Sequence, residues 1–462
     1  MPTLINTKLQ THRGYPRIWL EGAKIQREGF APGMRYRMME QNKTLVLTIC
    51  DSGDYVVSIR KRGATSFPVI DITQQRLGEL FPGVERLRVV VRAGCMIISI
   101  HHHHLNCRNR YWRLIQNLQQ HQAITIGSLF HGGGILDKAV HQGFANQGLD
   151  TKLGIAVELE SQYLDASLTN NAELWSVTSM AVESGVQFLQ LQPGATQFDG
   201  VVAGIPCTGA SLSGRSKLKL TYAEDHESAG ACFFWFLMFV QSVNPAFVLV
   251  ENVPAYASTA SASVIRSVLQ TLGYHLQERV FGGCEFGALE DRKRWVLVAL
   301  SEGLQEGFSL NAVQPLRTKP SRLGDILEPI SLESDCWKSY DYLADKEQAD
   351  KAAGKGFRRQ LLTADDTQCG TIGRSYNKAR STEPFLRHPE DPHRSRLFSP
   401  REHARLKGIP ESVVDGLSTT TAHEVLGQSV VFPVFEAIAQ ALAKHLLVCA
   451  SVEETQPDRS AA

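Results

Sequence analysis

The chain has 462 residues, of which 43% are hydrophobic and 21% charged, as is ordinary for a folded globular protein of two or three domains. No apolar run reaches the ~18 residues of a membrane-spanning helix, and residues 1–30 lack the apolar core of a signal peptide. The nine cysteines are scattered and include no C-x-x-C pair. This usage indicates a reducing compartment such as the cytoplasm, and we expect no membrane association and no bound metal.

Charge is unevenly spread along the chain. Residues 1–120 contain 18 Lys and Arg against 8 Asp and Glu, whereas the remaining residues contain 30 and 39. This asymmetry predicts a polyanionic partner for the N-terminal part, although a basic β domain without such a partner fits the charge equally well.

Residues 1–105 are predicted to form a basic, β-rich accessory domain of barrel or swapped-hairpin type. Turn signals such as Pro32-Gly33 and Ala93-Gly94 separate short segments that have strand composition. Residues 17–38 resemble the SymE/AbrB-like DNA-associated folds. His101 to His104 could bind a metal, but an exposed polar run at a strand end is favoured. Residues 106–122 are predicted to be a connecting helix. The expected strands are 17–22, 34–40, 43–50, 55–62, 68–72, 86–91 and 96–100.

A βαβ unit begins at Ile124. A predicted strand, 124–130, is followed by a glycine turn, an amphipathic helix and a second strand, 154–160. Gly132, Gly133 and Gly134 would let the backbone approach a ligand, and Glu158 follows Gly134 by 24 residues. That order of elements favours a nucleoside-type cofactor with its ribose on the acid, although such glycines also serve tight helix–strand packing.

Cys207 follows a buried strand, 198–203, and stands on a turn that Pro206 stiffens. Small residues surround the thiol, which suits a nucleophile that a substrate must approach closely. The alternative is an inert buried cysteine in a turn. The polar segment 211–230, which begins at Ser211, is expected to be a mobile loop beside the site.

Polar residues also end or precede two later strands. Glu251 and Asn252 end the strand 244–252, where a carboxylate of an open α/β sheet faces the ligand crevice. Arg292 and Arg294 directly precede the strand 295–300. The alternatives are a strand-end acid that caps a helix and a solvated basic edge.

The C-terminal third changes character. Residues 302–395 lose the α/β periodicity and are expected to form a small second lobe, with 10 Lys and Arg against 5 Asp and Glu in 351–396. Residues 396–450 are predicted to return to the catalytic domain as helices, the first with Ser399 as N-cap and Pro400 at its first position. Residues 451–462 are expected to be a disordered tail.

Taken together, these motifs resemble the DNA (cytosine-5) methyltransferase family over roughly residues 124–447. SLFHGGG resembles the family's first motif, GIPCTGAS its Pro-Cys motif, VENV its Glu-Asn-Val motif and EDRKR its Gln-x-Arg-x-Arg motif, and SPREHARLKGIP and GQSV resemble the last two motifs. All occur in the family's linear order. The resemblance implies catalytic roles for Cys207, Glu251, Arg292 and Arg294, cofactor contacts for Phe130, Gly132, Gly134, Glu158, Pro206, Gln428 and Ser429, and substrate contacts for Ser211 and Asn252.

The chain departs from the family pattern at several positions. Glu290 stands where the family usually has Gln, and Gln428 replaces the usual Asn of the last motif. The third motif usually offers an Asp to the adenine, but residues 176–180 contain none. The fifth motif is also hard to find. These departures indicate a divergent branch in which the arginine pairing and the adenine contact differ.

The resemblance implies an α/β, Rossmann-like, S-adenosylmethionine-dependent catalytic domain over 123–301 and a target-recognition lobe over 302–395. It also implies a covalent Cys207 adduct with a flipped cytosine of double-stranded DNA, formed by a monomeric enzyme that needs no metal. Three alternatives remain open: a tRNA cytosine-5 methyltransferase, a non-catalytic DNA-binding regulator on the same fold, and a nicotinamide dehydrogenase. The dehydrogenase would explain neither the Cys nor the Glu-Asn pair.

Overall fold

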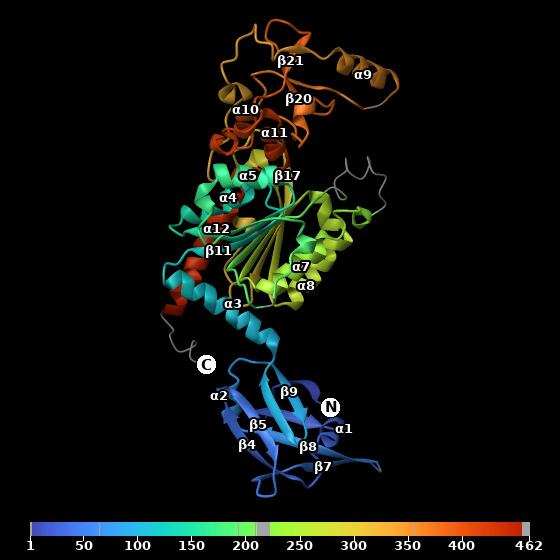
Figure 1. Cartoon of the computed structure of the whole chain (residues 1–462), viewed down its shortest axis with the longest axis vertical. Coiled ribbons are helices and arrows are strands. Elements are labelled where there is room, and N and C mark those ends of the chain that lie inside the picture. Colours follow the sequence, from blue (N-terminus) through green and yellow to red (C-terminus); the bar gives the residue numbers. More distant parts are fainter. Residues whose placement is uncertain are drawn as a thin grey trace. The chain divides into compact units, whose positions relative to one another are not determined.

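A computed structural model describes residues 2–63, 65–192, 194–207, 209, 222–354 and 356–454. The chain divides into an N-terminal unit, Met1–Trp112 together with the last residues Glu453–Ala462, and a large unit, Arg113–Val452 (Figure 1). The division falls inside the helix α3 (His102–Gln119), seven residues beyond the predicted domain end at 105. The second half of this helix therefore belongs to the large unit.

The N-terminal unit contains two β-sheets that share one hydrophobic core. Their strand orders are β1-β9-β10-β5-β4-β6 and β2-β3-β8-β7, so the unit is β-rich, as predicted. Alternate side chains of β9, Leu87, Val89 and Val91, are buried in that core. The first two strands escaped prediction because their residues are mostly polar and exposed. The strands are β1 (Thr3–Lys8), β2 (Gln10–His12), β3 (Tyr15–Glu21), β4 (Arg35–Gln41), β5 (Thr44–Ile49), β6 (Tyr55–Val56), β7 (Ser58–Arg62), β8 (Thr65–Thr73), β9 (Arg86–Arg92) and β10 (Cys95–Ile100), with short helices α1 (Ala23–Arg27) and α2 (Arg76–Leu80).

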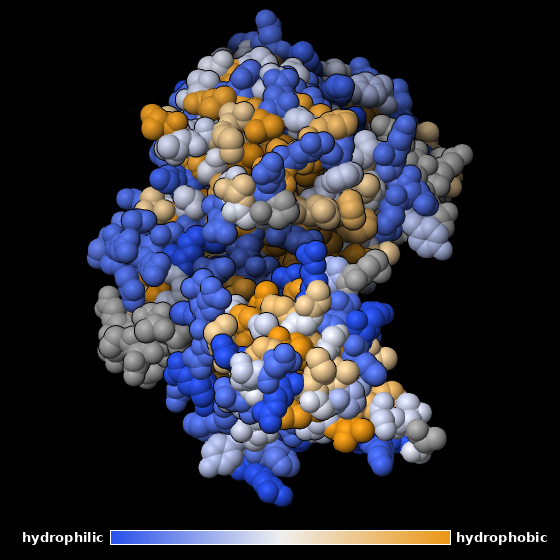
Figure 2. Space-filling model, turned by 60° about the horizontal axis from the view of Figure 1, so that its bottom comes forward, coloured by the Kyte–Doolittle hydropathy of each residue, from blue (hydrophilic) through white to orange (hydrophobic). Residues whose placement is uncertain are grey.

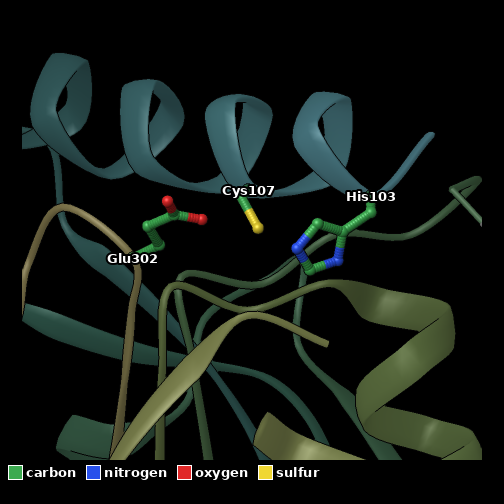
Figure 3. A group of neighbouring side chains, drawn as sticks. All are labelled: His103, Cys107 and Glu302. Atoms are coloured by element: carbon green, nitrogen blue, oxygen red, sulfur yellow. The ribbon is translucent and has the colours of Figure 1, made fainter. Parts of the chain in front are cut away.

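The four-histidine run directly follows the end of β10, where it was predicted, and His102 to His104 also begin α3. His101 lies between β10 and the helix, and its Nδ1 accepts a hydrogen bond from the backbone N–H of His103 at 3.2 Å. That bond satisfies one of the free amides of the first helical turn, which explains why the helix starts earlier than predicted. His103 and Cys107 lie one turn apart and point to the same side of α3 (Figure 3). Two such groups do not by themselves make a metal site.

The large unit is built on a seven-stranded sheet in the order β13-β12-β11-β14-β15-β17-β16. The first five strands in this order are parallel, and β17 is antiparallel to both of its neighbours. The helices α7 and α8 cover one face, and α4 and α12 lie on the other (Figure 1). This α/β arrangement confirms the predicted Rossmann-like fold class. The strands are β11 (Ile124–Leu129), β12 (Thr151–Glu158), β13 (Met180–Glu183), β14 (Gly200–Gly204), β15 (Phe247–Asn252), β16 (Tyr274–Gly282) and β17 (Lys293–Ser301), and the helices are α4 (Ile135–Ala145), α5 (Ser161–Asn170), α7 (Cys232–Val243) and α8 (Ala260–Thr271).

A smaller sheet, in the order β18-β21-β20-β19, forms the centre of the second lobe. Its core contains Trp337, Ile372 and Leu386, and it also includes Leu289 and Leu406 from the segments that flank the lobe. The lobe therefore packs against the segment that joins β16 to β17 and against residues 400–406, which follow the lobe. Its elements are β18 (Lys338–Ser339), α9 (Asp341–Ala352), β19 (Gln360–Leu362), β20 (Pro384–Arg387) and β21 (Arg394–Arg396).

Three helices follow the lobe: α10 (Pro400–Leu406), α11 (Thr419–Gln428) and α12 (Phe432–Glu454). The predicted cap of α10 is confirmed, because the Ser399 hydroxyl accepts a hydrogen bond from the N–H of Glu402 and Pro400 is the first helical residue. The helix α12 continues to Glu454, past the predicted start of the tail at 451. The remainder of the predicted tail, 455–462, lies outside the described residues.

Among the described helices, α12 alone is long and apolar enough, by length and composition, to cross a membrane. The relevant window within Phe432–Val452 has a mean hydropathy of 1.3, and 61% of it is buried inside the protein. Sequence inspection missed it because Glu436 and Lys444 interrupt the apolar residues. Burial of most of this apolar window is typical of a core helix. On the face drawn in Figure 2, hydrophobic residues occur in separate groups among hydrophilic ones.

The C-terminal half of α3 fixes the start of β14. Arg113 donates hydrogen bonds to the carbonyl oxygens of Phe198 and Asn244, both at 2.7 Å. Asn117 donates to the buried carboxylate of Asp199, which also accepts the N–H of Thr125 at 2.9 Å. These bonds tie the helix to β11 and β14, so Arg113 belongs to the structural core of the large unit.

We therefore predict that a chain starting at Leu105 folds and binds the cofactor, whereas one starting at Ile115 is less stable. Loss of the charged hydrogen bonds of Arg113 should lower the unfolding free energy by about 1.5–3 kcal/mol. Arg113→Ala in the full chain is the matched variant, and denaturant unfolding measures both. An unfolded or insoluble Leu105 chain would show that the N-terminal unit is a structural part of the large unit.

Candidate active site

The carboxyl ends of the parallel strands bring the predicted site residues to one edge of the large sheet. Pairing sets β11, β12, β14 and β15 side by side in the same direction. The glycine turn follows β11, Glu158 ends β12, Cys207 follows β14 and Glu251 lies at the end of β15. In an open α/β sheet, this edge is where ligands bind.

A buried polar network shapes the turn after β11. The His131 ring contacts the Asp137 carboxylate through Nδ1 at 2.8 Å and the Ser167 hydroxyl through Nε2 at 2.8 Å. Phe130 and Gly132 adopt left-handed backbone conformations, with φ of 58° and 57°. The network therefore fixes a backbone conformation that turns the chain sharply at the strand end.

Gly134 serves the packing of the protein itself. Its φ is 75°, and a Cβ at this position would lie 2.4 Å from the Ser167 hydroxyl and 2.9 Å from His131 Nε2. The sequence suggested that this glycine leaves room for a ligand. A side chain here would collide with the network beneath the turn, so a Gly134 variant tests folding, and the cofactor contact of Gly134 stays a prediction.

The Glu158 carboxylate lies against the same turn. One oxygen accepts the N–H of Gly132 at 2.7 Å, and the other accepts the N–H of Glu160 at 3.0 Å. Both amides hold the acid in place, and its remaining lone pairs are able to accept ribose hydroxyls. Glu183, at the end of β13, is the register partner of Glu158 and is exposed. The sequence analysis looked for the acid of the family's third motif at residues 176–180, which precede β13. It therefore did not consider Glu183, at the end of that strand.

Gln428 reaches the glycine turn from the end of α11. Its Nε2 would lie 3.4 Å from a Cβ placed on Gly132, and it is buried with no hydrogen-bond partner among the described residues. A buried amide without a partner is costly, and a ligand carboxylate beside the turn would satisfy it. The neighbouring Ser429 hydroxyl, in contrast, donates to the Leu426 carbonyl at 2.7 Å and closes the helix.

These groups fit S-adenosylmethionine, whose methionine carboxylate and ribose need a donor and an acceptor, respectively. Gln428 Nε2 would face the carboxylate, and Glu158 would face the ribose hydroxyls. Phe130 and Gly132 shape the turn between them, and Pro206 lies on the neighbouring strand end. The donor and the acceptor thus both lie close to Gly132 in the turn after β11.

Asn252 positions the loop that carries Cys207. Its side-chain N–H donates to the Ile205 carbonyl at 3.0 Å, and its Oδ1 accepts the N–H of Val253 at 2.8 Å. The side chain is 1% exposed, so the amide is used inside the protein. This geometry favours a positioning role over the substrate contact that the sequence suggested. Ser211, the other predicted substrate contact, lies outside the described residues.

Glu251 and Arg294 form a close ion pair at the mouth of the site. Arg294 Nε lies 2.6 Å from Glu251 Oε1, with side-chain exposures of 12% and 13%. The second oxygen, Oε2, lies 3.5 Å from where a Cβ on Gly204 would be, and that same position is 4.0 Å from the Phe130 carbonyl. The carboxylate therefore sits between the strand that leads to Cys207 and the cofactor turn.

The surroundings of Cys207 favour its protonated thiol in the free protein. Burial raises the pKa of Cys207, the charge of Glu251 raises it further, and Arg294 and Arg292 oppose both effects. The thiolate is the nucleophilic form, so the raised pKa keeps Cys207 less reactive in the free protein. All three charged residues thus act on the sulfur electrostatically.

Arg292 is buried behind the ion pair. Its Nη1 donates to the Ile372 carbonyl of the small lobe at 3.2 Å and lies 3.5 Å from Glu290. Burial, reinforced by the charge of Arg294, lowers the pKa of Arg292 to about 10. This arginine therefore joins the small lobe to the catalytic strand, and its contact with Ile372 is made inside the protein.

The acid at position 290 is balanced by a lysine that sequence reasoning missed. Lys407 Nζ lies 3.4 Å from Glu290 Oε2, and both side chains are fully buried. The N–H of Ile372 donates to the other Glu290 oxygen at 2.9 Å. Burial, together with the charge of Arg292, lowers the pKa of Lys407 to about 7. The lysine lies 117 positions later in the chain, so only the fold reveals the pair.

We predict that Gln428→Leu weakens S-adenosylmethionine binding by about 1.5–3 kcal/mol, because a hydrogen bond to a charged carboxylate is lost. Ser429→Ala is the matched control, since its hydroxyl is committed to Leu426, and it should leave the affinity unchanged. Isothermal titration calorimetry measures both. Equal affinities for the two variants would contradict the assignment of Gln428.

We also predict that alkylation of Cys207 by iodoacetamide is slow at pH 7 and accelerates up to and beyond pH 9, roughly tenfold per unit below the thiol pKa. The sign follows from the raised pKa of Cys207, because only the thiolate reacts. Mass spectrometry of the peptide that contains Cys207 gives the rate. A rate at pH 7 that exceeds that of a free thiol would show a depressed pKa instead.

Comparison with known proteins places this site in a family. The model of the C-5 cytosine-specific DNA methylase family matches residues 124–444. Type II methyltransferase M.NlaX of Neisseria lactamica is 30% identical over 251 residues, which cover 52% of this chain and 75% of the relative. M.SsoII of Shigella sonnei is 28% identical over 255 residues, covering 53% and 64%, so the chain spans less than two thirds of that relative's length.

The fold is similar to that of solved methyltransferases. The crystal structure of the S. pombe Dnmt2 methyltransferase matches 70% of this chain and 98% of its own, with a TM-score of 0.53 and 18% identity. The region matched by the family model, residues 124–444, contains the glycine turn, Cys207, Glu251 and the two arginines. The chain belongs to the C-5 cytosine-specific DNA methylase family, which uses S-adenosylmethionine as its methyl donor.

Proposed function

We propose that the chain transfers a methyl group from S-adenosylmethionine to carbon 5 of cytosine in double-stranded DNA. The observation that carries this proposal is the placement of the Cys207 thiol and the Glu251–Arg294 pair on the sheet edge that also holds the cofactor turn. A nucleophile, a group for the ring nitrogen and a methyl-donor site on one edge are what methylation at carbon 5 needs.

Carbon 5 of cytosine is a poor nucleophile until carbon 6 is attacked. The Cys207 thiolate forms a bond to carbon 6, and the ring then behaves as an enamine at carbon 5. Glu251, in its protonated form, donates its proton to the ring nitrogen as the sulfur adds and takes it back when the sulfur is expelled. Arg294, through its pair with Glu251, orients that carboxyl group. S-adenosylmethionine, when bound, supplies the electrophilic methyl group. Loss of the carbon 5 proton and expulsion of the Cys207 sulfur then restore the aromatic ring.

The target base must leave the duplex to reach this thiol. Cys207 lies on a strand end at the sheet edge, where a base still stacked in a helix has no access. Arg292 is held by the small lobe through Ile372, so we assign it to positioning of Arg294 and of the lobe. This differs from the catalytic role that the family resemblance implies for Arg292.

The small lobe, 302–395, is proposed to read the DNA sequence around the target. Residues 351–396 are locally basic, and segments outside the catalytic sheet are free to vary without loss of the chemistry. One part of the lobe is an exception, because the Ile372 backbone binds both Glu290 and Arg292. Sequence reading is therefore assigned to the lobe outside 369–376.

The chain is further proposed to act as a monomer in the cytoplasm. Cys207, Glu251, Arg294 and the cofactor turn all come from one chain, so no second copy is needed to complete the site. All nine cysteines are free thiols, as expected of a reducing compartment.

We predict that Cys207 forms a denaturant-resistant adduct with duplex DNA that contains 5-fluorocytosine when S-adenosylmethionine is present. Fluorine at carbon 5 cannot leave as a proton does, so the adduct persists. Cys207→Ser should give none, and Cys336→Ser, in the small lobe, should give the wild-type amount on denaturing gels. An adduct that survives in Cys207→Ser would remove the nucleophile from this site.

We predict that exchange of residues 328–366 and 377–395 with those of a related enzyme changes which cytosines are methylated. The exchange keeps 369–376, so the contacts of Arg292 and Glu290 are retained. Bisulfite sequencing of treated DNA reads the pattern. An active chimera with an unaltered pattern would place sequence recognition elsewhere in the chain.

A further inference from the structure

The outer face of the six-stranded sheet in the N-terminal unit is open and has an unusual composition. Side chains alternate along β9, so Leu87, Val89 and Val91 are buried, whereas Arg88 and Arg92 are exposed on the opposite face. We call this opposite face the outer face. It lies wholly within one unit of the chain.

An apolar row crosses the outer face from strand to strand. Leu4 is the register partner of Val90, Val90 of Ile97, Ile97 of Val46, and Val46 of Met39. Leu4, Ile97 and Met39 are 55%, 41% and 51% exposed, and the two valines are half-buried. Five aliphatic side chains in one continuous exposed row are typical of an interaction surface.

Cations flank this row on both sides. Arg92 and Arg37 lie toward one side of the row, and Arg88, Arg86 and Lys8 lie toward the other. No strand residue of the outer face is Asp or Glu. Among the described residues, Lys8, Arg86, Arg88 and Arg92 have no ion-pair partner. Within the described part of the chain, the positive charge of these four residues is therefore not compensated by an acid.

Several other arginines of the same unit are paired with acids. Arg17 binds Asp71 through two hydrogen bonds of 2.7 and 2.8 Å, and Arg60 binds Glu21 at 2.9 Å. These pairs use the second sheet, β2-β3-β8-β7. These arginines of the second sheet are neutralised by acids, whereas no such pair is found around the apolar row among the described residues.

The apolar row and the cations beside it together favour some kinds of binding partner over others. A second copy of the same face would bring like charges together, which disfavours a symmetric contact. Duplex DNA would satisfy the arginines, but it would set hydrated phosphates against five aliphatic side chains. An amphipathic helix with acidic flanks would satisfy both features, since its apolar stripe covers the row and its carboxylates meet the cations.

We propose that the outer face docks an acidic amphipathic helix of a partner protein. The row crosses five strands, so its four steps of ~4.8 Å span ~19 Å. A helix rises 1.5 Å per residue, so about 13 residues cover that length. This proposal does not rest on the methyltransferase function, because every group it uses lies in the N-terminal unit.

The test uses the full chain and a fluorescein-labelled 15-residue peptide with leucines on one helical stripe and glutamates on both sides. A scrambled peptide of the same composition and a 15-base-pair duplex are the other probes. Anisotropy should show at least tenfold tighter binding of the striped peptide than of the scrambled one. Ile97→Asp and Leu4→Asp should each weaken striped-peptide binding at least tenfold, and the matched charge variant Lys61→Glu should not.

Salt separates the possible occupants further. At about 0.5 M salt the striped peptide should remain bound through the apolar row, because only the ionic part is screened. Equal binding of the striped and scrambled peptides would overturn the proposal. The proposal would also be overturned if Arg88→Glu abolished binding of the DNA duplex while Ile97→Asp still bound the striped peptide with wild-type affinity. Methyl transfer by Ile97→Asp, measured in parallel, should be unchanged, which keeps this result distinct from any failure of the catalytic proposal.

Discussion

The register between β14 and β15 sets Gly204 opposite Glu251, and the candidate site depends on that pairing. Because position 204 has no side chain, the Glu251 carboxylate can lie over the strand that leads to Cys207 and close to the cofactor turn. Strand side chains alternate between faces, so a slip of one residue would turn Glu251 to the opposite face. The hydrogen bond from Asn252 to the Ile205 carbonyl adds a second constraint on the same pair of strand ends.

A group of buried charges lies behind this edge. Glu290 and Arg292 lie just before β17, Lys407 directly follows α10, and the backbone of Ile372 binds Glu290 and Arg292. Removal of one partner from such a group leaves an uncompensated buried charge, which typically costs 3–5 kcal/mol. The group therefore couples the small lobe to the catalytic arginines, and it explains how an acid is accommodated where the family usually has a neutral amide.

Much of this arrangement could be predicted from the sequence, because strand, turn and helix patterns are local. The Cys207 turn, the acids at the ends of β12 and β15 and the capped start of α10 are all readable from neighbouring residues. Long-range contacts were not readable. The pairing of Glu290 with Lys407, the unpartnered amide of Gln428 beside Gly132 and the inward use of Asn252 depend on segments that the fold brings together. The polar strands β1 and β2 also lacked the apolar alternation on which strand prediction rests.

The most direct test of the catalytic account is transfer of a labelled methyl group to duplex DNA and to transfer RNA, with the modified atom identified by mass spectrometry of the nucleosides. The geometry of Cys207 and Glu251 predicts label in DNA as 5-methylcytosine and none in the Cys207→Ser variant. Label found only in RNA would contradict the proposed substrate. Label on the exocyclic nitrogen of cytosine, or wild-type transfer by the Cys207→Ser variant, would contradict the mechanism.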